Sequence, residues 1–203
     1  MPHINVVSFL VTMAVVLPSL TIHEFAHGWT AYKFGDHTAK SMGRLTLNPI
    51  AHIDLFGTIL LPFLIGIGYA KPVPVNFSIL TRTQMLLVAI AGPASNVLLA
   101  TILALAYHVL PIDNISVLKQ LILLGVQLNI VFAVFNLIPI PPLDGSKVVF
   151  TGLKSPQALN IYRIFSQFGM LILVVFLLIG GFSLIIVPFV KMFFNLFNLP
   201  LMS

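Results

Sequence analysis

The sequence contains no cysteine and carries very little charge. Only 7% of its 203 residues are Asp, Glu, Lys or Arg, whereas 59% are hydrophobic. A soluble domain carries roughly 25% charged residues, so most of this surface is not built to face water. The absence of cysteine excludes disulfides and thiolate metal ligands. The composition therefore predicts a polytopic α-helical membrane protein, with residues 1–203 forming one domain embedded in a lipid bilayer.

Acidic residues are especially scarce, and their scarcity constrains the chemistry. The chain has five acidic residues against ten Lys and Arg, and Glu24 is its single glutamate. The excess of positive charge is not gathered into a run. Such a distribution is typical of loops that set membrane orientation, so nucleic acid is not an expected partner.

Long apolar runs define the predicted membrane helices. They cover about residues 5–32, 83–110 and 117–138, and each reaches the ~20 residues that span a bilayer as a helix. A final apolar region, about 161–199, is interrupted by Gly180 and Gly181, which favours two helices. We expect about five to six membrane helices in total.

The segment Leu55–Tyr69 is apolar but is not expected to cross the membrane. It has 15 residues, including Gly57 and Pro62, and is short for a spanning helix. If it does not cross, most Lys and Arg residues lie on one side, as cytoplasmic loops require. The sequence therefore predicts a re-entrant or β-hairpin region at roughly 40–80, and a multi-pass protein whose active site lies toward the cytoplasm.

The motif His23-Glu24-Phe25-Ala26-His27 carries the most specific chemical signal. On a helix, positions i and i+4 share a face, so both imidazoles can reach one Zn²⁺ ion while Glu24 stands beside it. Ionisable residues inside a membrane segment are functional by default. We therefore predict one Zn²⁺ per chain, with His23 and His27 as ligands and Glu24 as the general base.

A catalytic zinc takes three protein ligands, so a third ligand must come from elsewhere. Because Glu24 is the only glutamate, the third ligand is an aspartate or another histidine. The candidates are Asp36, Asp54, Asp113, Asp144, His3, His37, His52 and His108. If Leu55–Tyr69 does not cross, Asp144 in "PPLDG" shares the membrane side of the motif and is favoured. His52 and Asp54 are the main alternatives, and are expected rather to orient the ligands. Asp36 and His37 resemble a solvated turn.

Asn96, in the stretch "AGPASN", is the remaining polar feature within a predicted helix. An amide in a membrane segment needs hydrogen-bond partners. Asn96 could donate to a substrate carbonyl or its oxyanion, or it could tie helices together. The spacing does not distinguish these two roles.

Five stretches, taken in order, resemble the site-2 protease family of intramembrane metalloproteases: "HEFAHG", "GRLTLNPIAHID", "AKPVPVN", "AGPASN" and "FNLIPIPPLDG". The resemblance is to compact members without PDZ or CBS domains. It implies transmembrane helices with a small β-structured region, and a zinc site below the membrane surface on the cytoplasmic side. It also implies His23, His27 and Asp144 as ligands, Glu24 as catalytic acid and base, and Asn96 as a residue that handles substrate.

The function expected from these features is hydrolysis of peptide bonds within or near transmembrane segments. The partners are then membrane protein substrates with a transmembrane helix, and whether a membrane partner regulates the enzyme is left open. The alternatives are a zinc-dependent membrane transporter and a noncatalytic zinc-binding scaffold. Neither alternative requires an acid and base beside the metal, so the role of Glu24 distinguishes them from a protease.

Overall fold

The computed structural model describes residues 6–54, 58, 71–111 and 117–201. Every regular element within these residues is helical, and they contain no strand. In the described parts of the region 40–80 the regular structure consists of short turns of helix, namely α2 (Thr38–Ser41), η1 (Pro49–His52) and η3 (Phe77–Ile79). The predicted re-entrant piece Leu55–Tyr69 lies, apart from Thr58, outside the described residues.

Three long helices match the predicted spans to within about two residues at each end. They are α1 (Val6–Lys33), α4 (Arg82–Val109) and α5 (Val117–Asn136), and each is long and apolar enough to cross a membrane. Helices α7 (Pro156–Gln167) and α8 (Gly169–Leu178) make a fourth candidate, bent by 65°. The described residues thus hold three or four candidate spans, and the expected count of five to six is not confirmed.

The break predicted at Gly180 and Gly181 is confirmed. Gly180 has a φ of 84°, in the left-handed region that favours glycine, and it separates α8 from the shorter apolar helix α9 (Gly181–Leu196). A second break at Phe168, which the sequence did not predict, separates α7 from α8. The last apolar region therefore forms two short helices, preceded by α7.

Local bonds explain how these helices tolerate their polar residues. Helix α4 begins with a capping box, in which Thr81 Oγ1 accepts from Gln84 N and Gln84 Oε1 accepts from Thr81 N. Within α1, the hydroxyls of Ser19 and Thr21 donate to the carbonyls of Val15 and Leu17. These bonds satisfy polar groups that a bilayer could not.

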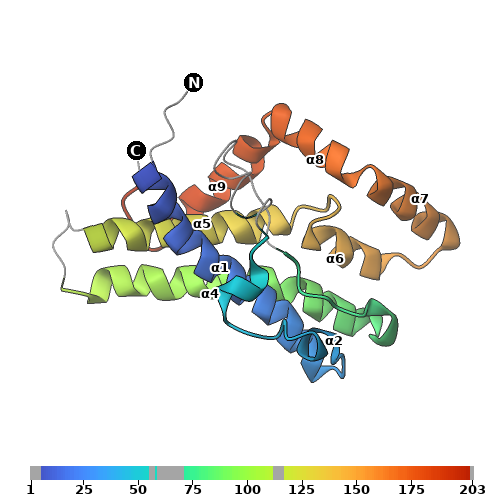
Figure 1. The fold of residues 1–203 in the computed structure, drawn as a ribbon. Coiled ribbons are helices and arrows are strands. Elements are labelled where there is room, and N and C mark those ends of the chain that lie inside the picture. The colour runs from blue at the N-terminus through green and yellow to red at the C-terminus, as the bar shows by residue number, and fades with distance from the viewer. Residues whose placement is uncertain (1–5, 55–57, 59–70, 112–116, 202–203) are drawn as a thin grey trace.

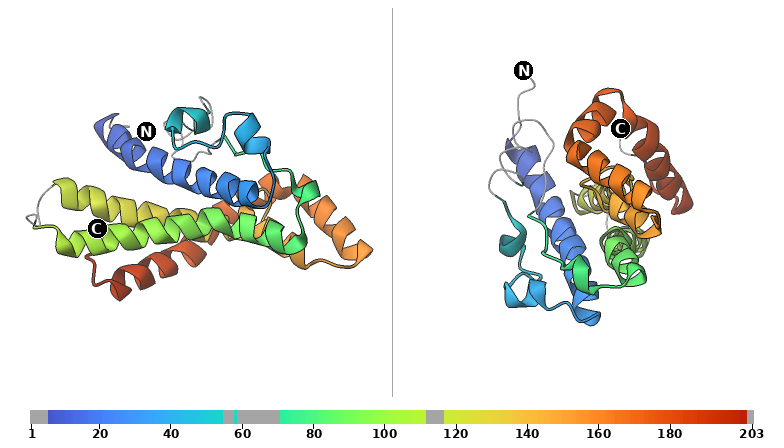
Figure 2. Two further views of the ribbon diagram at one scale, coloured as in Figure 1. Left: turned by 90° about the horizontal axis from the view of Figure 1, so that it is seen from below. Right: turned by 90° about the vertical axis from the view of Figure 1, so that its right-hand side faces the viewer.

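Helices α4 and α5 lie side by side as the central pair, with α1 across one face and α9 on the other (Figures 1 and 2). Small residues permit the close approach. Ala100 and Ala104 of α4 are fully buried with Val126 of α5, and an added Cβ on Gly125 would lie 2.8 Å from the Leu103 side chain.

Helix α6 (Asp144–Gly152) follows α5 and packs against α4. Its first turn approaches the end of α5 so closely that an added Cβ on Gly145 would meet the Leu137 carbonyl oxygen and lie 2.6 Å from that of Ile138. Because both neighbours are backbone, only glycine fits there. This contact sets the first residue of α6, Asp144, against α1.

Candidate metal centre

The two motif histidines lie one turn apart on the buried face of α1. His23 is 3% exposed and His27 is 7% exposed. Their rings meet edge to face, with centroids 4.7 Å apart. The i, i+4 spacing therefore brings both imidazoles to one point, as predicted.

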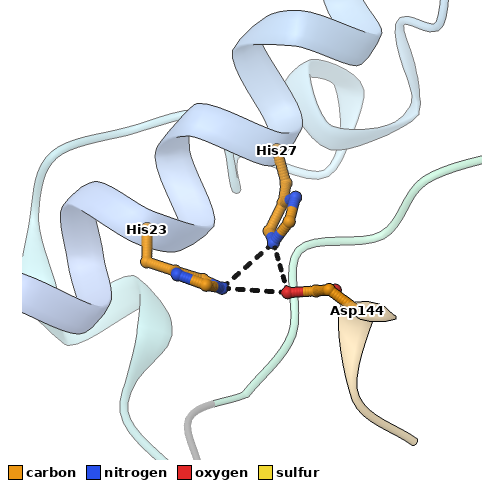
Figure 3. A group of neighbouring side chains, drawn as sticks. All are labelled: His23, His27 and Asp144. Carbon is orange, nitrogen blue, oxygen red and sulfur yellow. Dashed lines mark hydrogen bonds and ion pairs between the residues drawn. The ribbon is translucent and has the colours of Figure 1, made fainter. Parts of the chain in front are cut away.

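Asp144 completes a triangle with these histidines (Figure 3). Its Oδ2 atom lies 3.2 Å from His23 Nε2 and 3.0 Å from His27 Nε2, and the two Nε2 atoms are 3.1 Å apart. Asp144 itself is 5% exposed. Three potential metal-ligand atoms thus face one another in a buried site, and Asp144 lies more than a hundred positions along the chain from the two histidines.

The remaining ring nitrogens define the tautomer of each histidine. His27 Nδ1 lies 2.7 Å from the Val88 carbonyl oxygen, and His23 Nδ1 lies 2.5 Å from Asn96 Oδ1. Because both partners are acceptors, each Nδ1 must carry the proton, which leaves each Nε2 with a free lone pair. Two such lone pairs and a carboxylate oxygen repel one another unless a cation lies among them.

The dimensions of the triangle fit zinc. Zinc bonds of about 2.0–2.1 Å in tetrahedral geometry place ligand atoms about 3.3–3.4 Å apart. The observed edges of 3.0–3.2 Å are only slightly shorter. Two imidazoles and one carboxylate are also a donor set that catalytic zinc accepts, with the fourth position open.

The second oxygen of Asp144 is held by a lysine. Lys147 Nζ lies 2.8 Å from Oδ1, one turn further along α6. Burial raises the pKa of the Asp144 carboxyl, whereas the positive charge of Lys147 lowers it. Because Lys147 binds Oδ1, Asp144 offers a single oxygen, Oδ2, to the triangle.

Asn96 is buried without any exposed surface, and its described bonds are all within the protein. Besides accepting from His23, its amide donates to Asn129 Oδ1 at 2.8 Å. Asn129 in turn donates to Ser19 Oγ and to the Gly125 carbonyl oxygen. These contacts favour the helix-tying alternative, and they add a role in orienting His23 that the sequence did not indicate.

The structure places His52 and Asp54 in the loop that precedes the undescribed segment. His52 is buried, and its Nε2 lies 2.9 Å from the Thr46 carbonyl oxygen. The backbone N–H of Asp54 donates to Thr58 Oγ1. Neither residue belongs to the group of ligand atoms found among the described residues, which consists of His23, His27 and Asp144.

Gly92 of α4 lies directly against the two imidazoles. An added Cβ would meet His27 Nε2 and would lie 2.6 Å from His23 Nε2. The sequence does not single out this glycine within the stretch "AGPASN". The contact of Gly92 with the imidazoles cannot be read from the sequence, because it depends on how α4 crosses α1. The local pattern of neither helix gives that crossing.

Comparison with known proteins is consistent with this geometry. The model of peptidase family M50 matches residues 11–115 and 111–180. The chain is 44% identical over 155 residues to YwhC of Bacillus subtilis, which covers 72% of this chain and 69% of the relative. It is 35% identical over 175 residues to Rip2 of Mycolicibacterium smegmatis, covering 84% and 67% respectively. Both relatives are named "putative zinc metalloprotease". No solved structure matches significantly.

We predict that Gly92→Ala weakens zinc binding by about tenfold or more, because the new methyl group must displace both imidazoles. Zinc content of the purified protein measures the effect. Gly152→Ala in α6 is the matched control, since an added Cβ there meets nothing within 4 Å. Alanine favours helix at both positions, so a loss confined to Gly92→Ala reports the contact. Equal zinc content in the two variants would contradict it.

A second prediction concerns Asn96. Asn96→Ala leaves the His23 Nδ1–H without its acceptor, and should lower zinc affinity by about 10- to 100-fold. Competition with a zinc chelator measures the affinity. Asn136→Ala is the control, because within the described residues the Asn136 amide bonds inside its own helix, to the Phe132 carbonyl oxygen. An Asn96→Ala variant with wild-type zinc affinity but slow cleavage would instead assign Asn96 to the substrate.

Proposed function

Because the chain belongs to peptidase family M50, the family of the site-2 proteases, we propose that this zinc metallopeptidase cleaves membrane proteins within or near their transmembrane segments. One observation carries the proposal. A buried His-His-Asp group with a glutamate beside it lies inside a bundle of helices that can cross a membrane. We take residues 1–203 as one membrane-embedded protease domain.

In this proposal His23, His27 and Asp144 hold the zinc ion. Bound there, zinc would supply a Lewis acid that activates water and polarises the scissile carbonyl. Lys147 keeps Asp144 in place by binding the oxygen that faces away from the triangle. Asn96 and the Val88 carbonyl oxygen hold the two rings with Nε2 toward the metal.

Glu24 is the proposed acid and base. It follows His23 on α1 and is half-buried. Its carboxylate takes a proton from the attacking water and then gives it to the leaving amine, so that hydroxyl adds to the carbonyl carbon and hydrogen to the nitrogen. The transporter and scaffold alternatives need no such residue.

The substrate must expose its peptide bond before this reaction, because a helix keeps its backbone hydrogen-bonded. We propose that the unwound substrate pairs with an extended segment near the site by β-strand addition, at Arg44–Leu47 or Lys71–Asn76. In the second segment the N–H groups of Lys71, Val73 and Asn76 already bond within the protein, and Pro72 and Pro74 have none. In the first segment the Arg44 N–H bonds to the Ala39 carbonyl oxygen and the backbone bends at residues 45–47, so these contacts do not choose between the two segments.

We predict that Glu24→Gln retains zinc and its fold but lowers the rate of cleavage by about 10²–10⁴-fold. Glutamine preserves an acceptor of the same shape while removing the base. The measurement is cleavage of a single-span membrane substrate by the reconstituted protein, with zinc content as the control. Cleavage by Glu24→Gln at the wild-type rate would exclude the mechanism.

We also propose that the metal site faces the cytoplasm. The end of the bundle nearest the site carries Lys33 at the end of α1 and Arg82 at the start of α4, and Arg82 bonds to the Leu153 carbonyl oxygen after α6. Lys119 lies at the opposite end, over the Tyr107 ring. This asymmetry agrees with the positive-inside tendency.

Because the chain contains no cysteine, single cysteines test this orientation without background labelling. Ser41→Cys lies near the metal end, and Val109→Cys, at a position 78% exposed, lies at the other end of α4. In intact cells a membrane-impermeant maleimide should label position 109, and should label position 41 only after permeabilisation. The reverse pattern would place the site outside.

A further inference from the structure

The segment Lys71–Asn76, called here the proline strap, crosses α1 beside the metal centre. The backbone N–H of Val73 donates to Glu24 Oε2 at 2.7 Å. Within the described residues, it is the one hydrogen bond made by the Glu24 side chain. It connects the proposed acid and base to a segment that provides no metal ligand.

The position of Val73 over α1 is fixed by its side chain as well as by its N–H. Val73 is 8% exposed, and its Cγ1 lies 2.9 Å from the place where a Cβ on Gly28 would stand. Gly28 is one turn beyond Glu24, on the same face of α1. The missing side chain at Gly28 therefore accommodates Val73, and its N–H meets Glu24 one turn away.

The first half of the strap is anchored at its carbonyl oxygens and at its first N–H. The Lys71 N–H donates to the His52 carbonyl oxygen at 3.0 Å. Arg44 Nη2 donates to the carbonyl oxygens of Lys71 and Pro72, at 2.8 and 3.3 Å. Pro72 and Pro74 flank Val73 and restrict its backbone to extended conformations.

The end of the strap is anchored by Asp36. The Asn76 N–H donates to Asp36 Oδ2 at 2.7 Å, and the Thr38 N–H donates to Oδ1 at 2.9 Å. Asp36 is 1% exposed. Burial would raise the pKa of its carboxyl, but these hydrogen bonds lower it below the usual range. The residue that the sequence placed in a solvated turn is a buried, ionised anchor.

We propose that the Val73 N–H positions Glu24 for catalysis. It holds Oε2, so that Oε1 is left to exchange protons with water and with the leaving amine. Val73 is a positioning residue, and Asp36 supports it by holding the strap. This inference rests on the proposed function, because it assigns a purpose to the geometry around Glu24.

Proline at position 73 tests the N–H directly, because it removes that donor from a strap already rich in proline. Val73→Pro in the reconstituted full chain should lower kcat by about 10- to 100-fold, the size expected for a hydrogen bond to a charged group. KM for a single-span substrate and zinc content should stay unchanged. The loss should exceed that of Val73→Ala, which keeps the N–H and loses only the packing on Gly28.

Val75→Pro is the matched control. It makes the same substitution two residues further along, at an N–H that does not bond to Glu24, and kcat should stay at the wild-type value. A kcat for Val73→Pro equal to that of wild type would overturn the proposal. An equal loss of kcat in both proline variants would also overturn it, because the effect would not depend on the Val73 N–H.

A loss of zinc from Val73→Pro would indicate that this variant does not fold. Asp36 therefore supplies a second test, which leaves position 73 unchanged. Asp36→Ala removes the acceptor for the Asn76 N–H and should lower kcat, with KM and zinc content unchanged. Asp36→Asn keeps one acceptor oxygen and should restore part of kcat. Wild-type kcat in Asp36→Ala, or a change in KM alone, would overturn the proposal.

The Glu24→Gln variant separates this inference from the function on which it rests. If Glu24→Gln cleaves like wild type, the mechanism itself fails, whatever the strap variants do. If Glu24→Gln is inactive while Val73→Pro keeps full kcat, Glu24 remains the base and only the positioning role of the strap is lost.

Discussion

The convergence of three acceptor atoms on one buried point is the constraint on which the rest of this structure depends. Two imidazole lone pairs and a carboxylate oxygen lie 3.0–3.2 Å apart, and they repel one another unless a cation is shared among them. To bring them together, α1, α4 and α6 must approach more closely than ordinary side chains allow. Gly92 provides the space beside the imidazoles, and Gly145 provides it where α6 meets the end of α5. The helix packing is therefore arranged around the metal centre.

Much of the helical framework could be predicted, because length and hydropathy are properties of each segment alone. The spans α1, α4 and α5, and the break at Gly180, follow from such local patterns. The spacing of His23 and His27 is equally local. Asp144 required a further step, in which topology placed it on the same membrane side as the motif. Contacts between elements could not be predicted. The burial of Asp36 and the position of Gly92 depend on partners tens of residues away, which no periodicity shows.

The carboxylates of Asp144 and Glu24 differ in whether an oxygen is left without a partner among the described contacts. Asp144 uses one oxygen in the triangle and the other on Lys147. It is thereby held as an anion suited to metal binding. Glu24 has one oxygen on the Val73 N–H, and the described contacts leave the other without a partner. A group that must accept and return a proton needs a free oxygen in a fixed place. This difference in partners is what the proposed roles require, with Asp144 as a metal ligand and Glu24 as the base, although both are carboxylates within one small site.

The polar network behind His23 shows why helix packing and metal geometry are interdependent here. Inside a bilayer, an amide without a partner is costly, so Asn96 and Asn129 must bond to other helices. They do so with each other and with Ser19, and in this way they join α4, α5 and α1. The last acceptor in that chain, Asn96 Oδ1, receives the His23 N–H. Any shift among the three helices therefore changes the direction of the His23 lone pair. Since zinc requires that direction to be fixed, metal binding in turn favours the one arrangement of helices that satisfies the network.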